Sequence, residues 1–314
     1  MEHKRILPVL ICVLAAACGI LSGILFHVSS GMTSLPESAV EDMISLLAED
    51  GILVDPGLIA TERRSATVYV CDSTDYNRTV AELLNETGVI SAYAVPDGEV
   101  MIMAGGARFE FGSSFTFRYF RSGRPVQSPA VFGMDSMAAQ ISESKRKGIS
   151  ETVTKFLDRG SGEFDELNVA ISVDSIWESE GKYYALCSRS IDGIEIAGNL
   201  VLCAVEGNTV TEAYGTWCFL TPPETYFAQL SDLINILFNV KKQLAGRADS
   251  AQTDADGTEI PPEPVRITEI DLCYSLYFYG GGDSFCLIPC WRIGTDTAGE
   301  MIYNAIDSTL YTVK

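Results

Sequence analysis

Hydrophobic and polar residues follow two periodicities along the chain. In four stretches the apolar positions recur every three or four residues, which is typical of helices that bury one side. The predicted helices cover 36–50, 75–88, 135–157 and 221–246. The last one is predicted to start at a capping box, Thr221-Pro222-Pro223-Glu224.

Between these helices, single apolar and polar residues alternate, which is typical of half-buried strands. Gly-containing turn signals such as Pro96-Asp97-Gly98 and Asp192-Gly193 separate them. The predicted strands cover 66–71, 90–95, 99–103, one or two stretches within 108–120, 164–177, 182–190, 198–205, 209–218, 265–279, 284–293, 300–306 and 308–313. The close spacing of strands and turns predicts an α+β fold of antiparallel sheets, each with a helix on one face.

The order of one helix followed by four strands occurs twice, which predicts repeated units. We expect a cytoplasmic end and anchor at 1–30 and an N-terminal α+β unit at 31–125. Helix-plus-four-strand units are expected at 126–220 and at 221–314, the latter with an acidic loop at 247–264. Units two and three are alike in pattern and not in residue identity.

The N-terminal region contains a 23-residue stretch, from Ile6 to Val28, without Asp, Glu, Lys or Arg. About 20 apolar residues suffice for a helix to cross a bilayer. Lys4 and Arg5 precede the stretch, so we expect a single-pass anchor in the cell membrane with a cytoplasmic N-terminus. A cleaved signal peptide and a lipoprotein acylated at Cys18 are the alternatives.

Small residues recur every four positions within this stretch, at Ala15, Gly19 and Gly23. Small residues at this spacing form a groove in which a second transmembrane helix can approach closely. We therefore expect these three residues to bind a partner helix, although Ala and Gly are also common in anchors by chance.

Charge and histidine content exclude several classes of function. The 42 acidic and 22 basic residues give a net charge of −20, which repels nucleic acid. Both histidines, His3 and His27, belong to the N-terminal region, so the predicted ectodomain lacks Ser-His-Asp or Cys-His catalysis and His-ligated zinc. We expect no enzyme, no catalytic residue, no metal and no cofactor.

Seven cysteines follow the anchor, and most lie in apolar strand-like stretches. They are Cys71, Cys187, Cys203, Cys218, Cys273, Cys286 and Cys290. In such surroundings a reduced cysteine is a small buried hydrophobe, although one or two disulfides remain open.

Other side chains are candidates for function or for the core. Acidic residues at Glu163, Asp165 and Glu166 could serve glycoside hydrolysis, although a solvated sheet edge is the commoner arrangement. Aromatic residues between 109 and 120 would form a partner-binding patch if they alternate outward. Three other aromatic residues, Phe285, Trp291 and Tyr303, are expected in the core.

Three stretches, 43–54, 287–293 and 303–307, resemble the YycH/YycI family of membrane-anchored extracytoplasmic proteins. The resemblance implies one transmembrane helix and an ectodomain of PepSY-like α+β units. It also implies contact with a cell-wall-sensing histidine kinase of a two-component system, and with a paralogous anchored regulator. No catalytic residue is implied. Ser308 departs from the family, because a glycine turn is expected after Asp307.

The sequence thus favours a non-enzymatic, membrane-anchored regulator of such a kinase. The alternatives are a surface lipoprotein or binding module for a cell-wall component and, after these, a carboxylate-based wall hydrolase.

Overall fold

The computed structural model has a mixed α+β fold, with two large sheets and four α-helices among the residues it describes. It describes residues 34–62, 64–72, 76–85, 87–112, 115–122, 141–159, 168–179, 181–217, 224–248, 252–253, 259–260, 264–279 and 284–313. No helix of this described portion is long and apolar enough to span a membrane.

The chain forms two compact units, each built from separate stretches of sequence. Unit 1 combines residues up to Ala66 with Gln229–Asp271 and the stretch that begins at Trp291. Unit 2 combines Thr67–Ala228 with Leu272–Cys290. The predicted division at 31–125, 126–220 and 221–314 describes a repeat along the sequence, and it stays a prediction.

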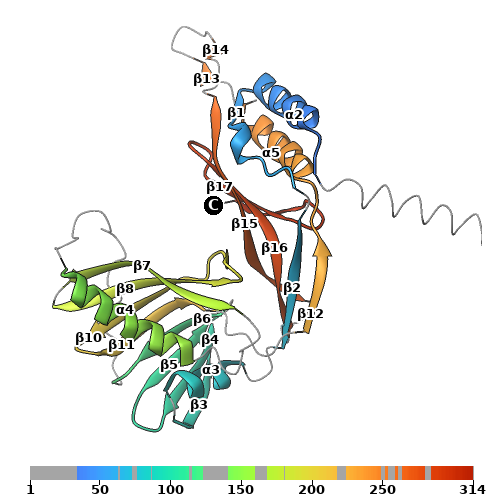
Figure 1. Cartoon of the computed structure of the whole chain (residues 1–314). Coiled ribbons are helices and arrows are strands. Elements are labelled where there is room, and N and C mark those ends of the chain that lie inside the picture. Colours follow the sequence, from blue (N-terminus) through green and yellow to red (C-terminus); the bar gives the residue numbers. More distant parts are fainter. Residues whose placement is uncertain are drawn as a thin grey trace, which may run out of the picture. The chain divides into compact units, whose positions relative to one another are not determined.

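Unit 2 contains an antiparallel nine-stranded sheet with two helices on one face (Figure 1). Its strands, in spatial order, are β3 (Val89–Val95), β4 (Gly98–Met103), β5 (Arg108–Gly112), β6 (Thr116–Phe120), β11 (Thr209–Thr216), β10 (Val201–Glu206), β8 (Lys182–Ile191) and β7 (Val169–Ser179), with β9 (Ile194–Glu195) beside β8. The helices are α3 (Tyr76–Asn85) and α4 (Glu143–Asp158).

The core of unit 2 lies between these helices and the sheet. Helix α4 contributes a buried stripe at helical spacing, Ile149, Val153 and Leu157. Helix α3 contributes Val80 and Leu84. The condition for an aromatic partner-binding patch, side chains that alternate outward, is not met by four of these residues, because alternate side chains of β5 and β6 face the helices. The four are Phe109, Phe111, Phe117 and Tyr119.

The second large sheet has seven strands, which β15 and β16 hold together. Its main path runs β1 (Ile52–Val54), β15 (Val265–Tyr279), β16 (Ser284–Thr295), β17 (Glu300–Asn304) and β18 (Leu310–Val313). Strand β2 (Ser65–Asp72) pairs with β16 and with β12 (Glu224–Gln229). Although the sheet is predicted to be antiparallel, β1 joins β15 in parallel. Separately, β13 (Gln252–Thr253) pairs with β14 (Glu259–Ile260) inside the expected acidic loop.

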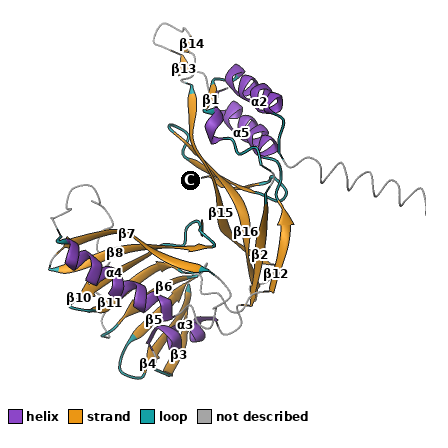
Figure 2. Cartoon of the chain, in the orientation of Figure 1, coloured by secondary structure: helices purple, strands orange, loops and turns teal. Residues whose placement is uncertain are grey.

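In unit 1, helices α2 (Glu37–Glu49) and α5 (Leu233–Ala248) lie side by side (Figure 2). The Lys241 ammonium of α5 links them, since it donates to the Leu46 carbonyl at 3.0 Å and meets the Asp50 carboxylate at 2.6 Å. A cation is favourable at the C-terminal end of α2, where backbone carbonyls lack helical partners.

The expected core residues Phe285, Trp291 and Tyr303 are all buried.

Two predicted helix starts are wrong. The helix expected from Thr221 begins at Leu233, and 224–229 form strand β12 instead. Its residues pair with β2, and Phe227 is 83% exposed, so Phe227 is no part of a buried helical stripe. The helix expected from Asp135 begins at Glu143, because residues 141–142 are not helical, and 135–140 lie outside the described residues.

The turn between β17 and β18 places Ser308 in the left-handed backbone region, with φ of +63°. This is the position at which the family resemblance leads us to expect glycine. The turn is held by the Asp307 carboxylate, which accepts from the Thr309 amide at 2.9 Å. The Ser308 amide donates to the Asn304 carbonyl at 2.9 Å.

We predict that Ser308→Gly raises the free energy of unfolding by about 0.5–1 kcal/mol, because glycine avoids the steric cost of this conformation but loses more backbone entropy. Gly299→Ala, at φ of +81° in the same unit, is the control and is expected to lower stability. Urea denaturation of the full chain in detergent measures both variants. A loss of stability in Ser308→Gly would contradict the assignment of strain to this turn.

Candidate functional site

The residues expected to bind a partner helix, Ala15, Gly19 and Gly23, lie outside the described residues, as does Cys18. The acidic cluster of Glu163, Asp165 and Glu166 also lies outside them. Neither set is therefore placed. The described residues instead bring together a cleft that the sequence did not indicate.

The cleft lies in unit 2 and has a volume of about 740 Å³. Five segments meet around it: the end of α3, the turn between β4 and β5, the end of β6, one side of α4 and the turn between β10 and β11. The residues of α4 that line the cleft recur at helical spacing, so they lie on one side of the helix. They are Gly148, Glu151, Thr152, Lys155, Phe156 and Arg159. This side adjoins the buried stripe of the same helix.

Cations predominate among the charged residues that line the cleft. Among the described residues that line it, the cations are Arg121, Lys155 and Arg159, and the carboxylate is Glu151. The Lys147 ammonium lies 4.0 Å from a carboxylate oxygen of Glu151 on the same helix, at an exposed position. The described part of the cleft lining thus carries more cations than anions, in a chain whose net charge is −20.

The buried side chain of Tyr119 interacts electrostatically with two of these cations. Tyr119 lines the cleft and is 5% exposed, and its ring lies 5.1 Å from that of Phe156. Burial raises the pKa of Tyr119, and the positive charges of Arg121 and Arg159 act in the opposite direction. Both guanidinium groups therefore act on the same hydroxyl, which stays protonated at neutral pH and can donate a hydrogen bond.

The backbone holds Arg121 at the edge of the cleft. Its amide donates to the Thr211 carbonyl at 2.9 Å, which continues the pairing of β6 with β11. Lys155 and Arg159 are four residues apart on α4, so they share one side of the helix. The three consecutive basic residues Lys145-Arg146-Lys147, on the same helix, do not line the cleft. The i, i+4 spacing of Lys155 and Arg159 was the available signal.

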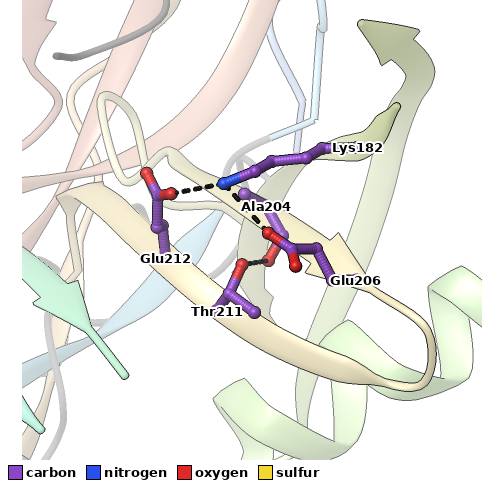
Figure 3. Close-up of polar contacts among 5 residues, drawn as sticks. All are labelled: Lys182, Ala204, Glu206, Thr211 and Glu212. Atoms are coloured by element: carbon purple, nitrogen blue, oxygen red, sulfur yellow. Dashed lines mark hydrogen bonds and ion pairs between the residues drawn. The ribbon is translucent and has the colours of Figure 1, made fainter. Parts of the chain in front are cut away.

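The face of the nine-stranded sheet opposite α3 and α4 carries a second polar group, drawn in Figure 3. The Lys182 ammonium lies 2.9 Å from a carboxylate oxygen of Glu206 and 2.9 Å from one of Glu212. Hydrogen bonds to Glu212 and Glu206 raise the pKa of Lys182, so it is charged at any physiological pH. On the same face the Trp177 and Tyr184 rings stack, with centroids 5.9 Å apart. Through these two ion pairs Lys182 of β8 connects the neighbouring strands β10 and β11.

Neither a metal-binding cluster nor an exposed free thiol is found among the described side chains. No group of three or more His, Cys, Asp and Glu side chains there could hold a metal ion. Five cysteines, Cys187, Cys203, Cys273, Cys286 and Cys290, are buried thiols. Burial raises the pKa of Cys203, and the neighbouring Cys187 adds to this effect, so its thiol is not a nucleophile at neutral pH.

Comparison with known proteins identifies no family. No family model matches the chain, and no curated protein matches it. An uncharacterized protein from Eubacterium rectale ATCC 33656 aligns with 12% identity and a TM-score of 0.40, over 84% of this chain and 90% of its own. The Bacillus megaterium YpeB C-terminal domain aligns with 14% identity and a TM-score of 0.26, over 78% of this chain and 97% of its own. Both likenesses are too distant to define a family.

We predict that Lys182→Met lowers the free energy of unfolding by roughly 1 kcal/mol at pH 7, since it removes two ion pairs at a partly solvated position. The folded-state pKa of Lys182 is raised, so its contribution is complete below the ordinary lysine pKa of about 10.4 and is lost in more alkaline solution. The difference between wild type and variant should therefore shrink only above that pH.

Lys147→Met is the matched control, because the Lys147–Glu151 pair is long and exposed and should contribute nothing measurable. Urea denaturation of the full chain at pH 7 and at alkaline pH gives both comparisons. Equal losses in the two variants would contradict a specific role for Lys182.

Proposed function

We propose that the chain is a non-enzymatic, membrane-anchored extracytoplasmic regulator of a cell-wall-sensing two-component histidine kinase. The observation that carries this proposal is the uncharged stretch from Ile6 to Val28, with Lys4 and Arg5 before it. The resemblance of 43–54, 287–293 and 303–307 to YycH/YycI proteins supplies the class of partner. The localisation proposed is a single-pass anchor in the cell membrane, with the bulk of the chain outside.

In this proposal the anchor helix contacts a transmembrane helix of the kinase. The groove of Ala15, Gly19 and Gly23 lets the two backbones approach closely, so van der Waals contact and weak hydrogen bonds can hold them together. A paralogous anchored regulator is a second partner for the same groove. Regulation then consists of a change in the position or rotation of the kinase helix.

The ectodomain would set the orientation of the anchor. Its mixed α+β fold, with two large sheets, is compatible with the PepSY-like units that the resemblance implies.

A surface lipoprotein or binding module for a cell-wall component is the second candidate, and the 740 Å³ cleft favours it. A binding module of this kind requires a ligand site but does not require a kinase as its partner. Mass spectrometry of the mature N-terminus separates the candidates, since a diacylated Cys18 would indicate a lipoprotein and an intact residue 1–30 segment an anchor.

We predict that a histidine kinase is recovered when the full chain is cross-linked in native membranes and purified. The double variant Gly19→Ile/Gly23→Ile should reduce its recovery about tenfold, because the larger side chains separate the helices at a cost of about 1–2 kcal/mol. Mass spectrometry of the cross-linked partners measures the recovery.

Ala17→Ile is the matched control, since the same enlargement then falls on the other side of the predicted helix. Recovery of the kinase should be unchanged in this variant. Undiminished recovery and signalling in the Gly19→Ile/Gly23→Ile variant would refute the groove, and recovery of no kinase by the wild-type chain would refute the regulatory proposal.

A further inference from the structure

The two ends of the nine-stranded sheet differ in how their edge strands are protected. Strand β7, at one end, carries the carboxylates of Asp174 and Glu178, has a bulge between Val173 and Ser175 and contacts α4. Strand β3, at the other end, pairs only with β4 among the described strands (Figure 1). Charges and bulges are the usual means by which a natural sheet keeps its edge from pairing with another chain.

The sequence of β3 favours pairing with a further strand. Its residues, Val89–Val95, include no charged residue and no proline. Its bulge lies at the start, between Val89 and Ser91, so the residues from Ser91 to Val95 pair regularly with β4. Alternate residues of such an edge direct their N–H and C=O groups outward, where they can bond to another strand.

The side chains of β3 are exposed on both faces of the sheet. Every residue from Ile90 to Val95 is exposed, and the exposed fractions are 69% for Ile90, 46% for Tyr93 and 37% for Val95. Ala92 lies opposite the buried Met101 of β4 and therefore shares the face that the helices cover, so Tyr93 is on the other face. Large apolar side chains concentrated on one exposed strand are typical of an interaction site.

We infer that β3 pairs with β3 of a second copy of this chain, antiparallel and about a twofold axis at Tyr93. This axis uses all of the regularly paired residues from Ser91 to Val95. Tyr93 then lies opposite Tyr93 of the second copy, Ala92 opposite Ala94, and Ser91 opposite Val95. The inference is independent of the membrane role proposed above, because it uses no residue of the anchor.

Side-chain type and charge favour a second copy as the occupant. The pairing is self-complementary, since a twofold axis gives each residue the same partner in both copies. The two Tyr93 rings form an aromatic cross-strand pair, and the small side chains of Ala92 and Ala94 let the strands approach on the other face. Because the whole chain has a net charge of −20, an uncharged strand is where two copies can approach with least repulsion.

The interface is small, so the dimer is weak and dissociates in dilute solution. Contact through one short strand belongs to the size class of transient complexes, below roughly 1,200 Å² of buried surface. The net charge of −20 on each copy opposes the approach at long range. Salt screens this repulsion and should therefore strengthen the dimer.

The decisive experiment is sedimentation velocity of the full chain in a neutral detergent, from roughly 10 µM to 1 mM, the range of weak complexes. We expect the protein mass to rise towards that of a dimer with concentration, and more steeply in about 0.5 M than in about 0.05 M NaCl. The Gly19→Ile/Gly23→Ile variant should dimerise equally well. Failure of the anchor groove and failure of this inference are therefore distinguishable.

Ser91→Glu and Ser172→Glu form a matched pair of substitutions. Both replace an exposed serine in an edge strand of the same sheet, and both add the same charge. Ser91→Glu should weaken the dimer at least tenfold, because it places a carboxylate opposite Val95 of the second copy. Ser172→Glu, on β7, should leave the dimer unchanged. Both positions are exposed, so both variants are expected to fold, and urea denaturation checks this.

The register is tested by Tyr93→Cys. Residues that face each other across an antiparallel pair have Cα atoms about 4.5–5.5 Å apart, within the range of a disulfide. Oxidation with diamide should therefore give more covalent dimer in Tyr93→Cys than in the wild type. Ser172→Cys is the control and should not exceed the wild-type level.

Three results would overturn the inference. One is a monomer mass at every concentration and salt level. Another is an equal weakening of the dimer in Ser91→Glu and Ser172→Glu, since β3 would then have no special part in it. The third is a dimer that salt weakens, which would indicate contact through charged surfaces. A dimer without the Tyr93→Cys cross-link would refute the twofold axis at this residue.

Discussion

The burial of one face of the nine-stranded sheet under α3 and α4 is the constraint on which the rest of unit 2 depends. Because strand side chains alternate, the residues that enter this core determine which ones face the other way. Tyr183 lies under Lys145 of α4, at 4.7 Å, so its neighbours Lys182 and Tyr184 are directed to the opposite face. The same burial orients α4: with Val153 and Leu157 in the core, Lys155 is left at the edge.

The cleft is a consequence of this packing. It forms where the polar edge of α4 passes the ends of β6 and α3 and the turn between β10 and β11. Among the described residues that line it, three are cationic and one is acidic, although acidic residues outnumber basic ones almost two to one in the whole chain.

Much of the fold could be predicted from local pattern, and the cleft could not. The strands β15 and β16 match the predicted 265–279 and 284–293 because their alternation is long and their ends carry turn residues. The turn at Asp192-Gly193 has positive φ at both residues, as this pair of residues predicts. By contrast, the stretch 224–229 has the residue types of a helix start, and only its pairing with β2 makes it a strand. The cleft needs the pairing of β6 with β11, and no local signal specifies such a distant partner.

The way in which the chain is divided between its units has a consequence for biogenesis. Unit 1 requires residues from Trp291 onward to join those before Ala66, and unit 2 requires Leu272–Cys290. Neither unit can therefore be completed before the C-terminal segments of the chain have been synthesised. Contacts between such distant residues also slow the search for the native state. Until the C-terminal residues are available, the strands that later pair with them present open edges, which is the arrangement most prone to aggregation during folding.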